Sequence, residues 1–570
     1  MSNPHLRLKA LAERGGSSRS PLVAPLLVSG LGLLGCGGLG NDELAAYVYQ
    51  CGTDPGISLW NNRDDHSCGR DDAKLPLEPS YDDFYVCETV VAKKSTPDEG
   101  DLDTDRIQAA LDKCKGQGKD GGAVKLVADG DNNAFIAGHL GVFEVILWID
   151  EGVTLYASRD PEQYQRELGT CGTIGINDSS ACADFISADG NSPGIIGEGT
   201  IDGQGGEPLV DRAYSWWEAS GALRGINGSI GNPTMINALS KTTNFILYRV
   251  KLVDAPKFHV KISSAPVRNT PGVPPCENPG DGFIVWGVTI LTPSKWMNSQ
   301  GRVMTPQWAR NTDGIDPGTS SVSSCGVIAC NTITTGDDQI AIKGGHQVSD
   351  LIIAHNQFGT GHGISIGSET MGDSVDDVTG ERLPAIENID IYDLTIDADS
   401  RWVGEDPHPN DFNGIRIKSD PSRGGVVTHV NYTDICMRDQ GNSILVSTSY
   451  NPLFSGIPAY MPHFGEITMR NVRGVTCSAT TQTTVSINGY SADNITGPVN
   501  LDNVVFDNIG PQSISSRYSD VVMGPGDVNF EISGWGTNVT DNRDPGSSKP
   551  PQCVFPTLPT PEGKPEDWVW

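Results

Sequence analysis

Basic residues are scarce in this chain. Its 570 residues include 40 Lys and Arg against 71 Asp and Glu, which gives a formal net charge of −31. Proteins bind nucleic acids and anionic lipid surfaces through basic faces, because their cations displace counterions or meet the headgroups. The composition therefore excludes wholesale binding to either, and a polyanionic ligand would have to be held by a few local cations.

Amphipathic helical patterns are nearly absent as well. The chain is 37% hydrophobic and 19% charged, so it has enough apolar residues for a large core and is not expected to be disordered. From about residue 190 onward, short β-branched runs recur, each closed by Gly, Asn, Asp or Ser. A sandwich of hairpins would need paired runs joined by two-residue turns, and these are not found.

One apolar pair, with its two members five residues apart, recurs at intervals of 25 to 43 residues. Asn or Asp lies inside several of these pairs, where it can adopt a left-handed turn or bond the neighbouring backbone. A variable period of short strands predicts an all-β fold, a parallel β-helix whose coils stack their apolar faces. The pairs are Leu247/Leu252, Val285/Ile290, Ile328/Ile333, Ile353/Phe358, Ile391/Ile396, Val430/Ile435, Ile467/Val472 and Leu501/Phe506, and the polar residues are Asn331, Asn356, Asp393, Asp434 and Asn471.

One helical pattern precedes the coils. In the stretch from Asp103 to Cys114, a capping Asp or Thr is followed by apolar residues at helical spacing. We expect this helix to cap the open N-terminal end of the β-helix and so prevent end-to-end strand pairing. The expected organisation is a signal peptide at 1–35, a Cys-containing segment at 36–80, the β-helix at 81–535, and a Pro-rich tail at 536–570 that wraps the side or extends free.

The N-terminus resembles an export signal. Four basic residues precede an apolar stretch from Leu22 to Gly35, which is too short to span a bilayer. The sequence Leu-Leu-Gly-Cys ending at Cys36 resembles a lipoprotein lipobox, so we expect lipidation of Cys36; the alternative is an ordinary signal peptide. The protein is expected to be an exported monomer, either secreted or a cell-surface or outer-membrane lipoprotein that meets a membrane only through this lipid. Cleavage would leave 36 basic against 70 acidic residues, a charge of −34.

Twelve cysteines remain after Cys36, and an even number in an exported chain indicates disulfides. Short separations favour pairs between Cys171 and Cys182 and between Cys325 and Cys330, followed by Cys51 with Cys68. No cysteines have zinc-site spacing with partner histidines, so no structural metal is expected.

Candidate catalytic residues recur at the interval expected for one coil of the β-helix without an inserted loop. Asp313 lies in NTDGID (311–316), Asp337 and Asp338 in TGDDQIAIK (335–343), and His362 in GTGHGISIGSE (359–369). The separations are 24 or 25 residues, and adjacent strands of a sheet lie about 4.8 Å apart. We therefore expect three carboxyl groups and one imidazole to line one face of the β-helix.

Two cations follow in GIRIK (414–418). Arg416 and Lys418 are two residues apart, so in a strand they point to the same side. Inverting glycosidases use one carboxylic acid to protonate the leaving oxygen and another to activate water. Crowding raises the pKa of at least one of several clustered carboxyl groups, and neighbouring cations can bind a sugar carboxylate. The pattern therefore indicates hydrolysis of an acidic sugar polymer.

These motifs closely resemble the polygalacturonases, the pectin-degrading members of glycoside hydrolase family 28. NTDGID, GDD, GHG and RIK match the four motifs of that family in order and spacing. GEGTIDGQG (197–205), NFILYRVKLVDAPKFHV (244–260) and DTDRIQAALDKC (103–114) are also similar to it. The resemblance covers about residues 80 to 530. It implies a right-handed parallel β-helix that hydrolyses α-1,4 galacturonosyl bonds of homogalacturonan with inversion and without a metal or other cofactor.

The resemblance also implies roles for the four central residues. Asp337 would be the general acid, while Asp313 and Asp338 would hold the attacking water. His362 would tune the ionisation of the acid and help to hold the site.

Substrate-binding roles are implied for further positions. Arg416 and Lys418 would grip the galacturonate carboxylate, and Tyr450 falls where the family has a substrate-binding Tyr. Asn311 and Asp316 belong to the first motif and would either contribute to sugar subsites or complete the turn.

Other interpretations remain open at this stage. A pectate lyase is also a parallel β-helix, but its chemistry uses Ca²⁺ and an Arg base. A non-catalytic β-helix binder would have lost at least one of the three aspartates, and none is lost. Trp216 and Trp217 would either stack on sugar or, as we favour, pack. The insertion from Ala265 to Gly282 would make the enzyme exo-acting if it closes one end of the cleft, and endo-acting if it does not.

Overall fold

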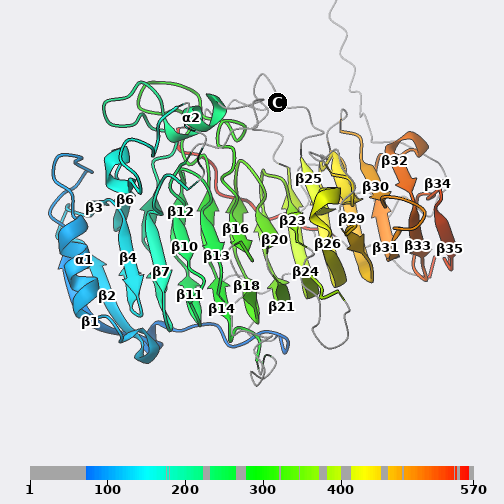
Figure 1. Ribbon diagram of the computed structural model, residues 1–570, viewed down its shortest axis with the longest axis horizontal. Coiled ribbons are helices and arrows are strands. Elements are labelled where there is room, and N and C mark those ends of the chain that lie inside the picture. The colour runs from blue at the N-terminus through cyan, green and yellow to red at the C-terminus, as the bar shows by residue number, and fades with distance from the viewer. Residues whose placement is uncertain are drawn as a thin grey trace, which may run out of the picture. The chain divides into compact units, whose positions relative to one another are not determined.

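The computed structural model describes residues 72–563, with gaps at 175, 177, 179, 223–230, 265–275, 277, 320–322, 346, 372–381, 399–411, 451–459, 478–480, 545 and 548–552. All of these residues belong to one compact unit, 51–570. Their short strands follow one another in repeated coils (Figure 1). The signal peptide, Cys36 and the pair Cys51 with Cys68 lie outside the described residues.

The strands form two large sheets in which all pairings are parallel, so the described chain is a right-handed parallel β-helix, as predicted. The smaller sheet has 12 strands, each contributed by a different coil: β4 Leu140–Phe143, β7 Ile186–Asp189, β10 Ile236–Ala238, β13 Val260–Ile262, β16 Ile315–Pro317, β20 Ile340–Gly344, β23 Ile364–Thr370, β25 Asn413–Lys418, β27 Asn442–Ser447, β30 Thr484–Asn488, β32 Ile514–Arg517 and β34 Gly534–Trp535.

The larger sheet has 23 strands. They are β1 Tyr85–Val91, β2 Gly122–Val127, β3 Ala134–Ala137, β5 Ile146–Ile149, β6 Thr154–Ala157, β8 Gly194–Gly197, β9 Thr200–Asp202, β11 Phe245–Tyr248, β12 Lys251–Val253, β14 Phe283–Trp286, β15 Thr289–Leu291, β17 Ser323–Ser324, β18 Gly326–Ala329, β19 Thr332–Thr334, β21 Val348–Ala354, β22 Gln357–Phe358, β24 Ile386–Asp397, β26 Val426–Arg438, β28 His463–Phe464, β29 Ile467–Val475, β31 Thr496–Phe506, β33 Ser519–Met523 and β35 Asn538–Asp541.

The apolar pairs predicted from the sequence stack in register over the first five coils. Leu247, Val285 and Ile328 are direct neighbours, as are their partners five residues later. Between β24 and β26 the register differs by two residues, because Ile391 lies beside Tyr432 and not beside Val430. Val430/Ile435 and Ile467/Val472 are again direct neighbours, and a second shift of two places Leu501 beside Met469. A shift of two keeps every side chain on its own face of the sheet, so the core continues without interruption.

The polar residues inside these pairs serve the backbone in two ways. Asp393, Asp434 and Asn471 have the left-handed conformation, with φ of 56°, 57° and 54°. Asn331 and Asn356 are instead buried, and the Asn331 amide donates to Asn356 Oδ1 at 2.9 Å in a ladder between coils. Both outcomes match the two possibilities that the sequence allowed.

Helices are few among the described residues. Helix α1 Thr104–Lys113 lies at the N-terminal end of the stack, where the sequence predicts it, with Ile107, Ala110 and Leu111 buried (Figure 1). Helix α2 Trp216–Ala222 lies in a loop region above the coils. Short 3-10 helices span Tyr81–Asp83, Gly118–Asp120, Pro161–Tyr164, Pro421–Arg423 and Pro511–Ser513.

Both tryptophans of α2 are packing residues. Trp216 is fully buried, and Trp217 is 3% exposed and donates its indole N–H to the carbonyl of Ala255 at 2.9 Å. Neither ring is available to stack on a sugar, so the favoured packing interpretation is confirmed.

The N-terminal segment 72–84 runs across the outside of the coils at the lower edge of Figure 1. The Asp72 carboxylate accepts a hydrogen bond from the Tyr392 hydroxyl at 2.7 Å. The Tyr81 ring stacks on Trp148 with a centroid distance of 5.2 Å. The segment thus covers apolar side chains on the outer face of the larger sheet.

The C-terminal tail also returns along the β-helix. Cys553 forms a disulfide with Cys436. The backbone N–H of Trp296 donates a hydrogen bond to the carbonyl of Glu562 at 2.8 Å. The tail from 553 to 563 therefore wraps the side of the β-helix, which was one of the two expected arrangements. Residues 538–541, expected in the tail, instead form β35 and extend the larger sheet beyond the expected boundary at 535.

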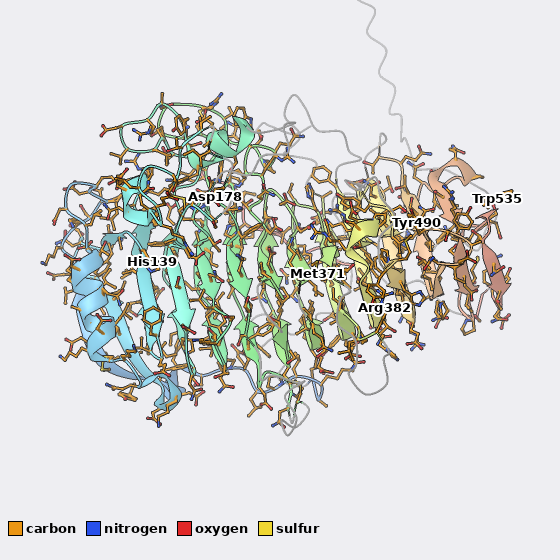
Figure 2. All side chains as sticks on the ribbon, in the orientation of Figure 1. His139, Asp178, Met371, Arg382, Tyr490 and Trp535 are labelled. Carbon is orange, nitrogen blue, oxygen red and sulfur yellow. A yellow bond between two sulfur atoms is a disulfide. The ribbon has the colours of Figure 1, made fainter. Side chains whose placement is uncertain are left out.

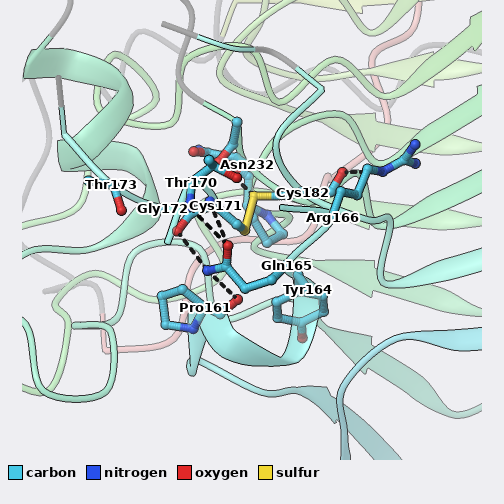
Figure 3. The surroundings of a disulfide bond; sticks show 12 residues. Pro161, Tyr164, Gln165, Arg166, Thr170, Cys171, Gly172, Thr173, Cys182 and Asn232 are labelled. Atoms are coloured by element: carbon cyan, nitrogen blue, oxygen red, sulfur yellow. Dashed lines mark hydrogen bonds between the residues drawn. A yellow bond between two sulfur atoms is a disulfide. The ribbon is translucent and has the colours of Figure 1, made fainter. Parts of the chain in front are cut away.

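Four disulfides join described residues: Cys87–Cys114, Cys171–Cys182, Cys276–Cys325 and Cys436–Cys553. The predicted Cys171–Cys182 bond is confirmed; Figure 3 shows it beside Gln165, whose amide oxygen accepts from the backbone of Thr170 and Cys171. The predicted Cys325–Cys330 bond is wrong. Cys325 is bonded instead to Cys276, which precedes the adjacent strand β14, so proximity in space outweighs the five-residue separation in sequence.

The C-terminal end of the stack exposes an aromatic side chain. Trp535 belongs to β34, the last strand of the smaller sheet, and is 75% exposed (Figure 2).

Among the described residues, no helix is long and apolar enough to cross a membrane.

Candidate active site

The candidate catalytic residues lie in the turns that precede three neighbouring strands of the smaller sheet. Ile315 of β16 pairs with Ile340 of β20, which pairs with Ile364 of β23. Asp313, Asp338 and His362 each stand two residues before these isoleucines and so share one register position in consecutive coils. The structure thus brings together the residues that the coil interval predicts.

The turns are held by backbone bonds between coils. The N–H of Gly314 donates to the carbonyl of Asp338 at 2.9 Å, and the N–H of His362 donates to that of Asp337 at 2.9 Å. Gly363 has φ of +75°, and a Cβ there would lie 2.1 Å from the carbonyl oxygen of Gly414. Only glycine fits this position, so the Gly-His-Gly motif fixes the backbone that presents His362.

Asp337 and His362 form a directly bonded pair, with 3.0 Å between Asp337 Oδ1 and His362 Nδ1. The Asp337 carboxylate also accepts from the backbone N–H groups of Asn311 at 3.1 Å and Asp338 at 3.0 Å. Burial opposes the charged carboxylate, but His362 outweighs it, so the pKa of Asp337 is well below its ordinary value. The pKa of His362 is raised, since Asp337 outweighs the effect of burial. The pair therefore holds its proton on His362 in the resting site.

Asp338 is bound by two cations. Arg416 donates to Asp338 Oδ1 at 3.0 Å and Lys418 to Oδ2 at 3.1 Å, and the Ser365 hydroxyl adds a 2.8 Å bond. Burial raises the pKa of Asp338, but Lys418 and then Arg416 lower it below its usual range. Asp338 is therefore ionised. Arg416 and Lys418 project from β25 to one side, as predicted, and both side chains are nearly buried.

Asp313 lies beside Lys343 of β20. Lys343 Nζ is 3.1 Å from Asp313 Oδ2, while Asp313 Oδ1 is buried without a hydrogen-bond partner. Burial raises the pKa of Asp313 to about 7, with Lys343 opposing and Asp337 adding to the rise. The expected carboxyl group with a raised pKa is thus Asp313, whereas Asp337 is shifted in the opposite direction because a histidine bonds it directly.

Lys343 was missed by sequence reasoning. It ends the motif TGDDQIAIK, five residues after Asp338, and its position in a strand with buried Ile340 and Ile342 was the available signal. Lys343 Nζ also lies 3.9 Å from Asp316 Oδ2. Asp316 is fully buried, which raises its pKa well above its ordinary value. In this conformation Asp316 is out of reach of a bound sugar.

The other predicted residues lie at the same site. The Tyr450 hydroxyl accepts a hydrogen bond from Arg416 at 3.1 Å, and Lys418 Nζ stands 5.3 Å from the centroid of the Tyr450 ring. Asn311 is exposed, and its backbone N–H bonds Asp337. All nine site residues predicted from the motifs thus lie in one region. Residues 265–275 of the insertion from Ala265 to Gly282, which was considered as a possible end wall, lie outside the described residues.

Asp337, Asp338 and His362 offer potential metal ligands within 4.8 Å of one another. The hydrogen-bond partners of these three side chains are better suited to proton transfer than to binding a metal ion. Asp338 is bonded by two cations, which would repel a third positive charge, and His362 Nδ1 is bonded to Asp337. The arrangement is suited to moving protons between carboxyl groups, an imidazole and a bound molecule.

The clustered carboxyl groups on one outer face of this parallel β-helix are the groups that acid–base hydrolysis of a glycosidic bond requires. The family model of the glycosyl hydrolases family 28 matches residues 175–523. The chain therefore belongs to glycosyl hydrolase family 28.

Individual relatives agree with this assignment. The chain is 33% identical to a polygalacturonase of Ralstonia solanacearum over 531 residues, covering 84% of this chain and 90% of the relative. It is 36% identical to an endo-polygalacturonase of Pectobacterium carotovorum subsp. carotovorum over 411 residues, covering 71% and 83%. Its fold is similar to the solved polygalacturonase from Erwinia carotovora ssp. carotovora, with a TM-score of 0.56, 28% identity and coverage of 85% of this chain and all of the other.

Proposed function

We propose that this protein is a polygalacturonase that hydrolyses α-1,4 galacturonosyl bonds of polygalacturonate with inversion at the anomeric carbon. One observation carries the proposal: three carboxyl groups in different protonation environments stand beside Arg416 and Lys418 on one face. Polygalacturonases among its relatives support the substrate class. A protein with a net charge of −31 needs such local cations to hold an acidic polymer.

We assign proton donation to the pair of Asp337 and His362. Asp337 gives a proton to the leaving glycosidic oxygen, and His362 supplies it, because the resting pair holds that proton on the imidazole. Binding of a sugar against the partly exposed pair removes water, which disfavours both charges and moves the proton toward the neutral pair. Asp337 then presents a carboxylic acid to the leaving oxygen.

Asp313 and Asp338 are assigned to the attacking water. Asp338 is ionised by its cations, and the buried Oδ1 of Asp313 has no hydrogen-bond partner among the described residues, so a water enclosed beside it by the bound sugar would supply one. Asp313 takes the proton that this water loses as its oxygen bonds the anomeric carbon. Its raised pKa makes it a stronger base than an ordinary carboxylate.

Arg416, Lys418 and Tyr450 are assigned to the sugar carboxylate. Both cations already bond Asp338, but an ammonium has three N–H donors and a guanidinium has five. Arg416 Nε has no hydrogen-bond partner among the described residues. Each cation can therefore bind a substrate carboxylate while it still holds Asp338.

Chelation provides a first test. Since every assigned step is a proton transfer by a side chain, activity on polygalacturonate should be unchanged after incubation with excess EDTA. The release of reducing ends would be measured before and after chelation. Loss of activity that Ca²⁺ restores would favour the lyase interpretation and overturn the assignment.

We further propose that the protein is exported and anchored to a membrane by a lipid on Cys36, acting as a monomer. The basic N-terminal residues, the apolar stretch and the Leu-Leu-Gly-Cys sequence support export and lipidation. The anchor would place the enzyme where an extracellular polymer is met, while the charge of the β-helix keeps it from binding anionic lipid on its own.

The Cys36→Ala variant tests this anchor. It should move the protein from the membrane fraction to the soluble exported fraction with its specific activity unchanged, because Cys36 is not among the residues assigned to catalysis or substrate binding. Fractionation and mass spectrometry of the mature N-terminus are the measurements. A wild-type protein that is already soluble and begins at another residue would contradict the lipid proposal.

A further inference from the structure

A half-buried phenylalanine continues the catalytic row by one coil. Val260 of β13 pairs with Ile315, so Phe258 holds the register position that Asp313 holds in the next coil. The backbone N–H of His259 donates to the carbonyl of Asp313 at 2.9 Å, which confirms the alignment. Adjacent coils are about 4.8 Å apart, so Phe258 lies directly on the N-terminal side of the catalytic carboxyl groups.

Three lysines surround the Phe258 ring. The ammonium groups of Lys257, Lys261 and Lys343 stand 5.1, 5.9 and 6.0 Å from its centroid. Lys343 is bonded to Asp313. Lys261 of β13 is the direct neighbour of Asp316 in β16. Following the same register position through β20 and β23 leads to Arg416 in β25, so Lys261 and Arg416 lie on the same side of the sheet. The ring and its lysines are thus part of the same face as the catalytic site.

Lys257 and Lys261 have no bonded counter-ion among the described residues, although Asp313 acts on Lys257, and Lys261 on Asp316, at longer range. Neither ammonium forms an ion pair or a hydrogen bond with a described residue, although the chain carries 71 acidic residues. Burial and then the charge of Lys261 lower the pKa of Lys257 to about 8, with Asp313 opposing. Two neighbouring half-buried cations repel each other, so their placement costs folding stability. A negatively charged ligand would remove this cost.

We propose that Phe258, Lys257 and Lys261 form a subsite for a second galacturonate residue, adjacent to the residue held by Arg416 and Lys418. This inference rests on the proposed function. The ring of Phe258 provides an apolar surface for the C–H face of the sugar, and the two ammonium groups bind its carboxylate. The catalytic face would then hold two consecutive acidic sugars, one at the cations on each side of the catalytic carboxyl groups.

Binding of hexagalacturonate to the inactive Asp337→Asn protein isolates this subsite from catalysis. In that background, the double substitution Lys257→Gln/Lys261→Gln should weaken binding by about 10-fold or more, as expected for the loss of charge-assisted hydrogen bonds. Phe258→Leu should weaken it less, because only the apolar surface is reduced. Lys113→Gln/Lys119→Gln is the charge-matched control, since these two side chains are 68% and 60% exposed near the N-terminal end; it should leave affinity unchanged.

Two further measurements separate a subsite from a structural role. The charge-retaining double variant Lys257→Arg/Lys261→Arg should keep most of the affinity, and the loss caused by the glutamines should shrink as salt is raised. Equal affinity of the glutamine double variant and its parent would overturn the subsite while leaving the proposed function intact. If wild-type protein releases no reducing ends and the Asp337→Asn protein does not bind hexagalacturonate, the proposed function fails and the subsite fails with it.

Discussion

The Asp337→Asn variant should lose hydrolysis of polygalacturonate by about 10²- to 10⁴-fold, the range typical of a missing general acid. Asparagine has nearly the same shape and can still accept the hydrogen bond from the N–H of Asn311, but it cannot carry the proton. The protein should still fold but with a lower thermal midpoint, because the lowered pKa of Asp337 means that its attraction to His362 exceeds the burial cost of its charge, and this stabilisation is lost. Reducing-end release and thermal unfolding are the measurements.

His362 supplies an independent readout of the same variant. Asp337 raises the pKa of His362, so its replacement should lower that pKa, which NMR of the imidazole can follow. The matched control is Asp120→Asn, an exposed carboxylate near the N-terminal end that should leave activity and the His362 titration unchanged. Substantial residual activity of Asp337→Asn in a normally folded protein would contradict its assignment as the proton donor.

The Lys418→Gln variant should lower kcat/KM on polygalacturonate by about 10- to 150-fold, which corresponds to one charge-assisted hydrogen bond of about 1.5–3 kcal/mol. The structure predicts a second effect, because Lys418 bonds Asp338 and lowers its pKa. Without Lys418, that pKa rises, and Asp338 stays protonated up to a higher pH. The acidic limb of the kcat profile should therefore move to higher pH.

The substrate comparison separates the two roles of Lys418. If it binds the sugar carboxylate, KM should rise more on de-esterified polymer than on methyl-esterified pectin, whose neutral esters the wild type already binds poorly. A kcat profile that does not move would contradict the coupling to Asp338, and equal losses on both substrates would contradict the contact with the sugar carboxylate.

Much of the fold follows from the sequence because stacking in a parallel β-helix imposes the same residue type at the same coil position. The pairs from Leu247/Leu252 to Ile391/Ile396 were found from a five-residue spacing alone, and they are direct neighbours. The two-residue shift after β24 could not be found in this way, since either register buries the same face. The Cys276–Cys325 bond was missed because a disulfide depends on where loops meet in space.

The site was more predictable than its electrostatics. The interval of 24 or 25 residues brings Asp313, Asp338 and His362 together, and it needs no knowledge of side-chain contacts. Which carboxyl group gains or loses a proton depends on bonds of about 3 Å, which a sequence does not contain. The histidine lowers the pKa of Asp337, and burial raises that of Asp313 although Lys343 stands beside it.

The products formed from polygalacturonate test the central claim most directly. Reducing ends and ultraviolet absorbance would be followed together, and the anomeric form of the first product would be read by NMR. Early products would also show the mode of cleavage, with monomer alone indicating exo action and mixed oligomers indicating endo action. The account predicts new reducing ends of inverted configuration with no absorbance from an unsaturated sugar. Unsaturated products that require Ca²⁺, or no cleavage by a folded protein, would contradict it.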